Sequence, residues 1–565
     1  MSKHYARRNK KENGEENFTS NGANSGNKDG NKRVNGSRHG RMGSDVKQDK
    51  FNDPSWYANN PQLLVDSASL AFSNAVGTEF SLESYTGNTY GRYGGSALPG
   101  VLSVAIAPLP GNTQETNSPV NMAARQIYGF VRHANSGSSN YDIPNLMMYL
   151  LSMDSLYSMY AYLVRAYGII SYYSVKNRYT GKAIIESMGL DYDDLLKNLA
   201  NYRTYINTFA DKIGALVVPK GMPYFIRHMW LYSNVYRDAD HEKSQFYIYN
   251  PEYFYIYNET AGTGRKIGSL VPYFFKGYVS GYDKSQAGLK KYSDIVELVN
   301  GMIDKVMESE DCGIMSGDIQ KAYGESGIWK LSTIPAEFNI TPVFDLEVLT
   351  QFHNIFTISD SSEGIPVTFG TVSEDIVGTE LAPILKVDNT CGAHADYSTP
   401  RRILDLPYSN ADPAHVMVAT RLNAVCYSQG AEDPQNPIPY ENTVIECGSE
   451  VACYFELYKF NTMAGHFVID KKQFGTVFDI TEVILDDTFG DIGHKYVDCV
   501  NDIEKFAFHP YIYAVYVDGK TYIKWIDGDV DNYTTVGIEE LRKMNQTALL
   551  SEFDTPQAAV WSLGR

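Results

Sequence analysis

Residues 145–173, NLMMYLLSMDSLYSMYAYLVRAYGIISYY, restrict the fold of this chain more than any other stretch. Pro144 precedes the stretch, where a helix readily begins, and apolar or aromatic side chains occur on every side of the helical wheel. Asp154 and Arg165 interrupt it, leaving uncharged runs of about ten residues, shorter than the roughly 20 apolar residues that a membrane span requires. The stretch therefore predicts a helix buried on all sides, either as the centre of a large domain or in a subunit contact.

The surrounding region, from about residue 120 to 350, predicts a mainly helical domain. Pro119 suits a first helical turn, Asp191 favours a helix N-terminus, and Gly324 is a typical stop. The expected helices are residues 119–133, 191–216, 293–311 and 316–324. Short extended pieces are expected at residues 101–107 and 244–257.

Beyond residue 358 the hydrophobic period approaches two, which is typical of strands. The strand-like stretches are 415–427, 449–460, 474–485 and a hairpin of 514–517 with 520–525, joined by a two-residue turn at Asp518-Gly519. Residues 537–553 predict a terminal helix. We therefore expect an α+β fold with three parts: a disordered basic arm at 1–50, a mainly helical domain at 51–358, and a β-rich region at 359–565 whose last helix returns to the helical domain.

The first 50 residues differ from the rest in charge and composition. Gly, Asn and Ser dominate residues 21–50, so burial cannot offset the entropy of ordering them, and we expect disorder. This arm holds 12 Lys/Arg against 6 Asp/Glu; because the whole chain carries −18, residues 51–565 carry −24. An acidic body disfavours binding of nucleic acid by the folded part, whereas the arm suits non-specific phosphate contact. A solubility tail or a plain linker is the alternative for the arm.

Twelve basic side chains of the arm are the candidate RNA contacts. They are Lys3, Arg7, Arg8, Lys10, Lys11, Lys28, Lys32, Arg33, Arg38, Arg41, Lys47 and Lys50. The start MSKHYARRNKK has no apolar segment of a secretory signal, and the chain has only six cysteines, so we expect it to stay in the compartment where it is made, with its thiols reduced.

Known catalytic and metal motifs are not found. Asp527, Asp529 and Asp531 resemble the start of a calcium loop, but Asn532 replaces the glycine at position six and Ile538 the glutamate at position twelve, so we interpret the stretch as a solvated acidic turn. A second set without a metal pattern comprises Asp486, Asp487, Asp491, Cys391 and His394. Residues interpreted as packing or capping are Cys447, Cys453, His133, His228 and His353. We expect no catalytic residue, no metal and no cofactor.

Three segments resemble the capsid protein of picobirnaviruses: residues 132–170, MPYFIRHMWLYSNVY at 222–236, and SEDCGIMSGDIQKAYG at 309–324. The resemblance covers about residues 120–350. It implies a structural protein that assembles from intertwined homodimers, in the host cytoplasm, into a non-enveloped icosahedral shell around double-stranded RNA. It also implies a helical shell region, a projecting region beyond about residue 360, and an arm that faces the genome.

The resemblance further implies two activities of some members, cleavage of the N-terminal segment by the protein itself and contact with a host membrane during entry. The sequence offers no identifiable nucleophile for the first activity and no basic amphipathic helix for the second. Two other functions stay open at the level of sequence. One is an RNA-processing enzyme with a basic tail, which would use the acidic sets above, and the other is a small-oligomer binding protein with a linker tail.

Overall fold

A computed structural model of the 565-residue chain gives its architecture. Contacts divide the chain into two units, residues 1–41 and 42–565, and all described residues belong to the second. Outside the description lie residues 1–54, 56–59, 71–78, 81–95, 98–99, 114, 136, 138–139, 177, 242–243, 262–265, 276–287, 359–367, 376–382, 391–400, 429–442, 462–467, 481–490, 519–520, 529 and 555–565. The predicted arm at 1–50 therefore falls outside the described residues.

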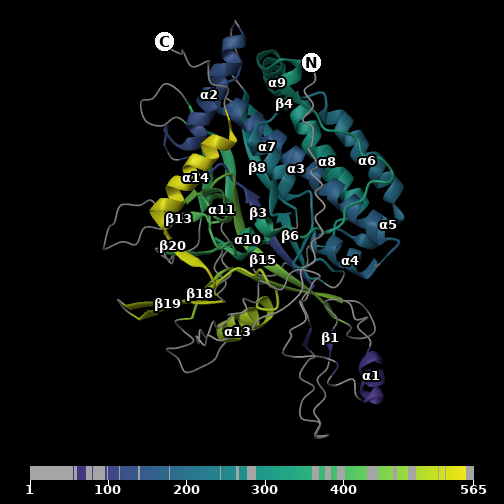
Figure 1. Ribbon diagram of the computed structural model, residues 1–565. Coiled ribbons are helices and arrows are strands. Elements are labelled where there is room, and N and C mark those ends of the chain that lie inside the picture. The colour runs from purple at the N-terminus through teal and green to yellow at the C-terminus, as the bar shows by residue number, and fades with distance from the viewer. Residues whose placement is uncertain are drawn as a thin grey trace, which may run out of the picture. The chain divides into compact units, whose positions relative to one another are not determined.

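Helices and strands are mixed along the described chain (Figure 1). The helices are α1 (Pro61–Ala68), α2 (Pro119–Ala134), α3 (Ile143–Tyr173), α4 (Arg178–Ser187), α5 (Tyr192–Lys197), α6 (Leu199–Ile213), α7 (Pro223–Leu231), α8 (Tyr292–Met307), α9 (Glu310–Tyr323), the 3-10 turn η4 (Glu325–Gly327), α10 (Leu346–His353), α11 (Pro413–Ala419), α13 (Asp491–Ile503) and α14 (Ile538–Glu552). The strands are β1 (Glu79–Phe80), β2 (Ser96–Ala97), β3 (Val101–Pro108), β4 (Val218–Pro219), β5 (Tyr236–Arg237), β6 (Phe246–Pro251), β7 (Tyr253–Ala261), β8 (Lys266–Phe274), β9 (Ile328–Trp329), β10 (Thr368–Asp375), β11 (Ile384–Thr390), β12 (Arg401–Asp405), β13 (Val425–Ser428), β14 (Thr443–Glu446), β15 (Glu450–Asn461), β16 (Val468–Phe474), β17 (Val477–Asp479), β18 (Ile512–Asp518), β19 (Thr521–Asp527) and β20 (Tyr533–Gly537).

Two sheets join distant parts of the chain. The larger runs β16-β15-β3-β6-β5, with β15 antiparallel to β3 and β3 parallel to β6. The other, β11-β10-β8-β7, is antiparallel throughout. In both sheets, strands from beyond residue 358 pair with strands from before it. The predicted division at 358/359 therefore separates segments that share sheets, and as a division into domains it stays a prediction.

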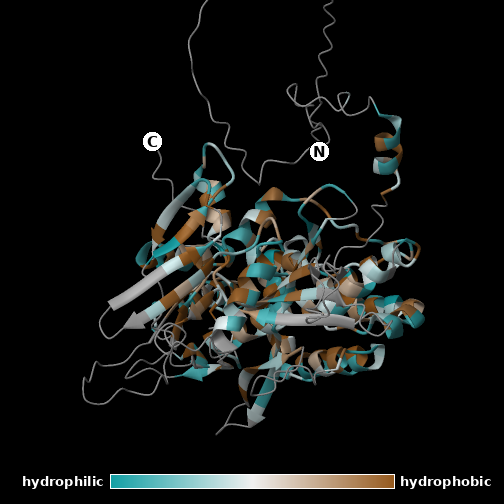
Figure 2. Cartoon of the chain, turned by 90° about the horizontal axis from the view of Figure 1, so that it is seen from below, coloured by the Kyte–Doolittle hydropathy of each residue, from teal (hydrophilic) through white to brown (hydrophobic). Residues whose placement is uncertain are grey.

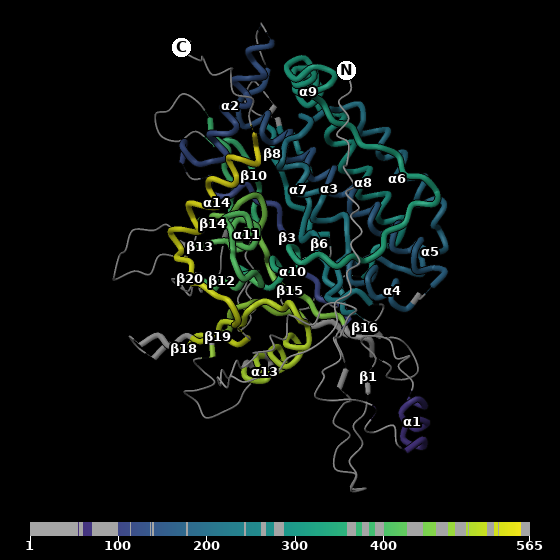
Figure 3. The backbone as a smooth tube through the Cα atoms, viewed as in Figure 1, coloured from purple at the N-terminus to yellow at the C-terminus, as the bar shows by residue number. Residues whose placement is uncertain are grey.

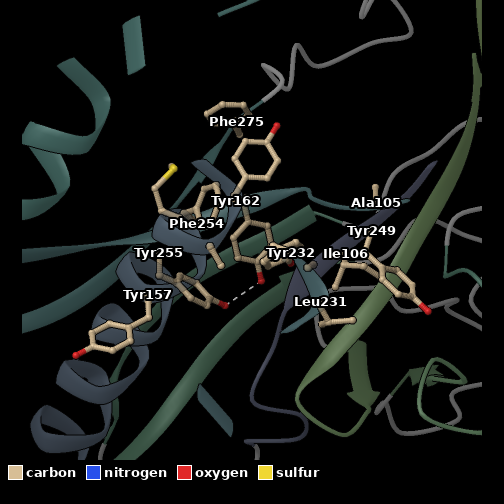
Figure 4. Close-up of a cluster of buried hydrophobic side chains, with 14 of the residues drawn as sticks. Ala105, Ile106, Tyr157, Tyr162, Leu231, Tyr232, Tyr249, Phe254, Tyr255 and Phe275 are labelled. Atoms are coloured by element: carbon tan, nitrogen blue, oxygen red, sulfur yellow. Dashed lines mark hydrogen bonds between the residues drawn. The ribbon is translucent and has the colours of Figure 1, made fainter. Parts of the chain in front are cut away.

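The long helix α3 is buried on all sides, as its sequence predicted. It spans 31 residues, and its buried positions include the polar Asp154 and Arg165. The helix packs against α2, α4, α6, α7 and β7 (Figure 1). Figure 4 shows Tyr157 and Tyr162 of α3 beside Phe254 and Tyr255 of β7, and in Figure 2 brown hydrophobic residues gather in the middle of the view. α3 is therefore the central element of the core.

Tyrosine hydroxyls of α3 donate hydrogen bonds to backbone carbonyls of neighbouring segments. Tyr149 donates to the carbonyl of Val217 at 2.8 Å, and Tyr157 donates to that of Trp329 at 2.9 Å. A third, Tyr167, donates to Ala336 at 2.8 Å. Each ring contributes apolar area while its hydroxyl satisfies a carbonyl that would otherwise be desolvated. The tyrosine richness of the chain thus has a role inside the subunit.

Several predicted elements are confirmed. The strand at 101–107 is β3, the extended stretch at 244–257 is β6 and β7, and the stretch at 449–460 is β15. The tail is α14. The hairpin of β18 and β19 is also confirmed, but Asp518 pairs with Thr521, so its two-residue loop is residues 519–520, one position later than predicted.

Several boundaries were predicted wrongly. The helix expected at 293–311 is α8, which ends at Met307, and the stretch at 474–485 holds the end of β16 and the short strand β17 in its described part. The strand-like start of 415–427 is helix α11, because Asp412 caps its N-terminus by accepting from His415 N at 2.9 Å and Pro413 occupies the first turn. The single helix at 191–216 is two helices, α5 and α6, which meet at Asn198. The helix expected at 316–324 begins earlier, at Glu310, because Ser309 accepts from Cys312 N at 3.1 Å.

No described helix is long and apolar enough to cross a membrane. For α3 the reason is its composition, since charged and hydroxyl side chains interrupt its apolar runs. This agrees with the interpretation of α3 as a core helix.

The close approach of α3 to Ile340 gives a stability prediction. A Cβ added at Gly168 would lie 2.6 Å from Ile340 Cγ1 and 3.0 Å from its Cβ, an atom that cannot swing away. Overpacking of this kind costs about 1–3 kcal/mol, more than the roughly 1 kcal/mol that alanine gains over glycine in a helix. We expect Gly168→Ala to lower the thermal unfolding midpoint. The control is Gly129→Ala in α2, where nothing lies within 4 Å and stability should rise slightly. Equal midpoints for the two variants would contradict the prediction.

Candidate functional site, a buried charge network

Six charged side chains from five segments gather in the core beside α14. They are Asp154 (α3), Arg227 and His228 (α7), Arg421 (just after α11), Glu450 (β15) and Glu552 (α14). Three are acidic and three basic, so the fully ionised set is neutral. Four of them are buried, whereas Arg227 and Glu552 are partly exposed. We refer to this set as the charge network.

Glu450 is the centre of the charge network. Its Oε1 accepts from Arg227 Nε at 2.7 Å and also from the Nη2 of the same guanidinium. Its Oε2 accepts from the Ser449 hydroxyl and lies 3.8 Å from His228 Nε2. The other ring nitrogen of His228, Nδ1, lies 2.6 Å from Asp154 Oδ2. One carboxylate on β15 therefore links two consecutive residues of α7, and His228 extends the link to α3.

The local structure of α7, β15 and α3 places the side chains of the charge network. Pro223 starts α7 at its first turn, and the short helix then presents Arg227 and His228 in succession toward β15 and α3. Glu450 is the first residue of β15, opposite Pro108 of β3. Asp154 is the acidic residue in the middle of α3, whose burial forces it to find a cationic partner.

Burial and pairing shift the pKa values of the network in opposite directions. Burial alone would lower the pKa of His228, but Asp154 and Glu450 raise it to about 10. Burial alone would raise the pKa of Glu450, but Arg227 and His228 hold it well below its usual range. For Glu552, burial and the nearby Glu450 together raise the pKa. Burial raises the pKa of Asp154, although His228 opposes this shift. Because its own pKa is about 10, His228 is protonated at neutral pH and cannot act as a general base.

Helix α14 closes over the network. Phe553, directly after it, stacks on Tyr224 with ring centroids 4.5 Å apart, and Tyr224 lies 4.5 Å from the ring of His228. Glu446 at the end of β14 accepts from Gln546 Nε2 at 3.1 Å and from Arg542 Nε at 3.3 Å. Figure 3 shows α14 beside β13 and β14. Helix α14 also packs on α2 and α7, while its return to a separate helical domain stays a prediction.

A second buried polar cluster occupies the β-rich part. His353 bonds the carbonyl of His509 through Nδ1 at 2.8 Å and the hydroxyl of Tyr511 through Nε2 at 2.9 Å. Tyr511 donates to Asp405 Oδ2 at 2.8 Å. The prediction that His353 is a packing residue is therefore confirmed, since both ring nitrogens bond groups of the core.

The backbone of the calcium-like stretch bonds the carboxylate of Asp405. The backbone N–H groups of Asp531 and Asn532 donate to Asp405 at 3.2 and 2.9 Å. These donors and His353 keep the pKa of Asp405 well below its usual range, although burial opposes the shift. Asp527 accepts from Tyr496, and Asp529 lies outside the described residues. Among the described residues no group of three or more His, Cys, Asp or Glu could hold a metal ion.

Most other predicted site residues cannot be placed. The twelve basic residues of the arm, and also Asp486, Asp487, Cys391 and His394, lie outside the described residues; Asp491 begins α13 without a described side chain. Cys447 and Cys453 are buried, as predicted. His133 is exposed and its Nδ1 lies 3.0 Å from the carbonyl of Gly129. His228 was predicted to be a packing residue, and the sequence analysis missed the charge network around it, although Asp154 within an apolar helix was a signal for it.

Loss of the central carboxylate gives a second stability prediction. Glu450→Gln would leave Arg227 without the carboxylate that it bonds and His228 with only Asp154 of its two acidic neighbours, and breaking a buried pair in this way costs about 3–5 kcal/mol. Asp375→Asn is the matched control, because Asp375 pairs with Lys386 at 3.3 Å on the surface and such pairs contribute about 0–1 kcal/mol. Denaturant unfolding of both variants measures the difference. A loss below 1 kcal/mol for Glu450→Gln would show that the network is not required for stability.

The histidine gives a third prediction, on pH. The pKa of His228 is about 10 in the folded chain and about 6.5 when unfolded, so its contribution to stability is complete below pH 6.5 and declines as the pH rises through 10. We expect the unfolding midpoint to fall between pH 7 and 9, and this fall to be smaller in His228→Gln. The control is His133→Gln, which changes an exposed histidine. Identical pH profiles for His228→Gln and the parent chain would contradict the assignment.

Comparisons with known proteins identify the family. Residues 56–518 match the family model described as "Picobirnavirus, Capsid protein". A capsid protein precursor of human picobirnavirus (strain Human/Thailand/Hy005102/-) is 28% identical over 547 residues, which cover 92% of this chain and 94% of that protein. The X-ray crystallographic structure of the picobirnavirus capsid matches with a TM-score of 0.70 at 22% identity, over 89% of this chain and 98% of that one, so it shares the fold. The protein is thus a structural component of a viral shell rather than an enzyme, and it belongs to the picobirnavirus capsid protein family.

Proposed function

We propose that this capsid protein assembles from homodimers into a closed icosahedral shell that encloses double-stranded RNA, and that assembly takes place in the host cytoplasm. Family membership over residues 56–518 is the observation that carries the proposal, because a capsid protein acts by associating with copies of itself. Exposed large apolar side chains on the described surface suit such association; they include Val175, Ile226, Met307, Met417 and Val497.

The arm at residues 1–50 is proposed to contact the packaged RNA without sequence specificity. Its net charge of +6, against −24 on the rest of the chain, would draw phosphates to the arm and away from the acidic body. Neutralising about six phosphates per arm gives a salt dependence with a logarithmic slope near −5. The contacts would come from the twelve Lys and Arg named above.

The division into a mainly helical shell region and a projecting region is part of the proposal. Helices α2 to α10 all precede residue 358, which supports a helical shell region at about 120–350. Strand β10 pairs with β8 of that region, β15 pairs with β3 just before it, and β11 and β16 extend the same two sheets, so all four strands belong to the shell in this proposal. The sheets β12-β20, β13-β14 and β17-β18-β19 consist only of residues beyond 358, and they are the part proposed to project.

Self-cleavage of the N-terminal segment and membrane contact during entry stay predictions from the family resemblance. The charge network does not supply a cleavage site, because its histidine is a protonated ion-pair partner and its Ser449 hydroxyl donates to Glu450. Neither activity has an assigned residue in the described part of the chain.

Deleting residues 1–50 tests the role of the arm. We expect the truncated protein to form particles by sedimentation and negative-stain microscopy, with less packaged RNA by the ratio of absorbance at 260 and 280 nm. Two full-length variants refine the test: the twelve arm Lys/Arg changed to Gln should lower the RNA content, and the six arm Asp/Glu changed to Gln should raise it. Equal RNA content in all particles would contradict RNA contact by the arm, and a species of one or two chains at every salt concentration would contradict the capsid proposal itself.

A further inference from the structure

Strand β20 has one edge whose backbone N–H groups meet no described partner. Its neighbour in the sheet is β12, in the register Ile403 with Thr535 and Asp405 with Tyr533. On β12, Ile403 N donates to the Tyr513 hydroxyl at 3.2 Å and Asp405 N to Asn354 Oδ1 at 2.8 Å. These two residues therefore point their backbone groups away from β20.

Antiparallel geometry then fixes the direction of the groups on β20. Residues directly opposite one another either exchange both hydrogen bonds or both point outward. Because Ile403 and Asp405 point outward, Thr535 and Tyr533 do so too, and Gly537 follows by the period of two. The backbone N–H groups of these three residues form no hydrogen bond with another described residue. The outer edge of β20 is thus unpaired within the described part of the chain.

The sequence of this edge lacks the usual protection against pairing. Proteins commonly guard an exposed edge with Lys, Pro or a bulge. Residues 533–537 read YTTVG, with no charge and no proline, and β20 pairs with β12 without a register shift. Tyr533 is 60% exposed, and Thr534 and Thr535 are exposed as well. An unguarded edge on a protein that associates with copies of itself is suited to an intersubunit contact.

We propose that β20 pairs antiparallel with β20 of a second copy of this chain, across a twofold axis at Thr535. The outward residues 533, 535 and 537 are symmetric about Thr535, so the edge is complementary to itself, as a twofold interface requires. Thr535 would face Thr535 of the second copy, and Tyr533 would cover Gly537 of the second copy. The two sheets β12-β20 would then form one four-stranded sheet. The proposal rests on the assembly proposed above and assigns one of its contacts.

A cysteine at the axis tests the pairing. Hydrogen-bonded antiparallel pairs have Cα atoms about 5.5 Å apart, within the roughly 4.4–6.8 Å range of disulfides. We expect full-length Thr535→Cys, assembled and mildly oxidised, to give a reducible dimer on a non-reducing gel. The matched control is Thr534→Cys, whose side chain lies on the other face of the sheet and opposite Val536 of the second copy, so it should give no more dimer than the parent chain.

The outcomes separate this contact from assembly as a whole. Particles in which Thr535→Cys remains monomeric on the gel, or in which Thr534→Cys links equally well, would overturn the pairing and leave the shell intact. If no particles form, the oxidised free subunits of Thr535→Cys are run on the same gel. A disulfide-linked dimer there supports the pairing of β20, and its absence overturns the pairing.

A proline variant and hydrogen exchange test the same pairing without an introduced cysteine. Thr535→Pro deletes the outward N–H but leaves the inward groups of Thr534 and Val536 to β12, so the subunit should fold with an unchanged unfolding midpoint and lose the contact. Hydrogen exchange should show Thr535 protected in particles and unprotected in dispersed subunits. Protection in dispersed monomers would mean that the chain covers its own edge, which would also overturn the proposal.

Discussion

The carboxylate of Glu450 is the interaction on which the packing of the described body most depends. It lies at the start of β15, more than 200 residues from Arg227 and His228, and it receives both of them. Through His228 the link reaches Asp154 in the central helix, and the stack of Phe553 on Tyr224 closes it from the other end of the chain. Because a buried charge without a partner costs several kcal/mol, none of these segments can separate from the others without a large penalty. The network therefore couples the two halves of the chain more specifically than apolar contact alone would.

Polar groups inside a mostly apolar core also explain why α3 can be buried over its whole length. A helix with hydrophobic residues all round fixes no single rotation about its own axis. Asp154 and Arg165 do so, since Asp154 must face α7 and Arg165 must face β6, where it donates to the carbonyl of Tyr249 at 2.8 Å and to Asn250 Oδ1 at 2.9 Å. The tyrosine hydroxyls that bond the carbonyls of Val217, Trp329 and Ala336 add further fixed points. Apolar area supplies the driving force for burial, and these polar contacts select one orientation.

The sequence predicted the local structure where the signal was local. The composition of 145–173 was enough for a buried helix, the alternation in 449–460 for β15, and the Asp518-Gly519 region for a hairpin, although its loop lies one residue later. The error at α11 has a local cause too, since the Asp412 cap and Pro413 outweighed an apparent period of two. The charge network could not be predicted in this way, because its members come from positions 154 to 552; Asp154 within an apolar helix signals a buried partner but does not identify it. The pairing of β15 with β3, over about 350 residues of separation, is of the same kind.

A shell subunit must satisfy two opposing requirements: its inner polar groups must be paired within one chain, and some outer groups must be left for its neighbours. The described body meets the first requirement around Asp405, where His353, Tyr511 and two backbone N–H groups surround one carboxylate. The charge network meets it in part, since Glu450 bonds Arg227 while Asp154 Oδ1 and His228 Nε2 have no hydrogen-bond partner among the described residues. That same cluster holds the residues just before β20, because Asn532 N bonds Asp405 and the Asn532 side chain bonds the carbonyls of Leu406 and Tyr408. The edge of β20 is therefore presented from a rigid base, with α14 fixing its other end. Rigidity on both sides lowers the entropy lost when such an edge meets a partner, and this is the condition under which a short strand can contribute to association.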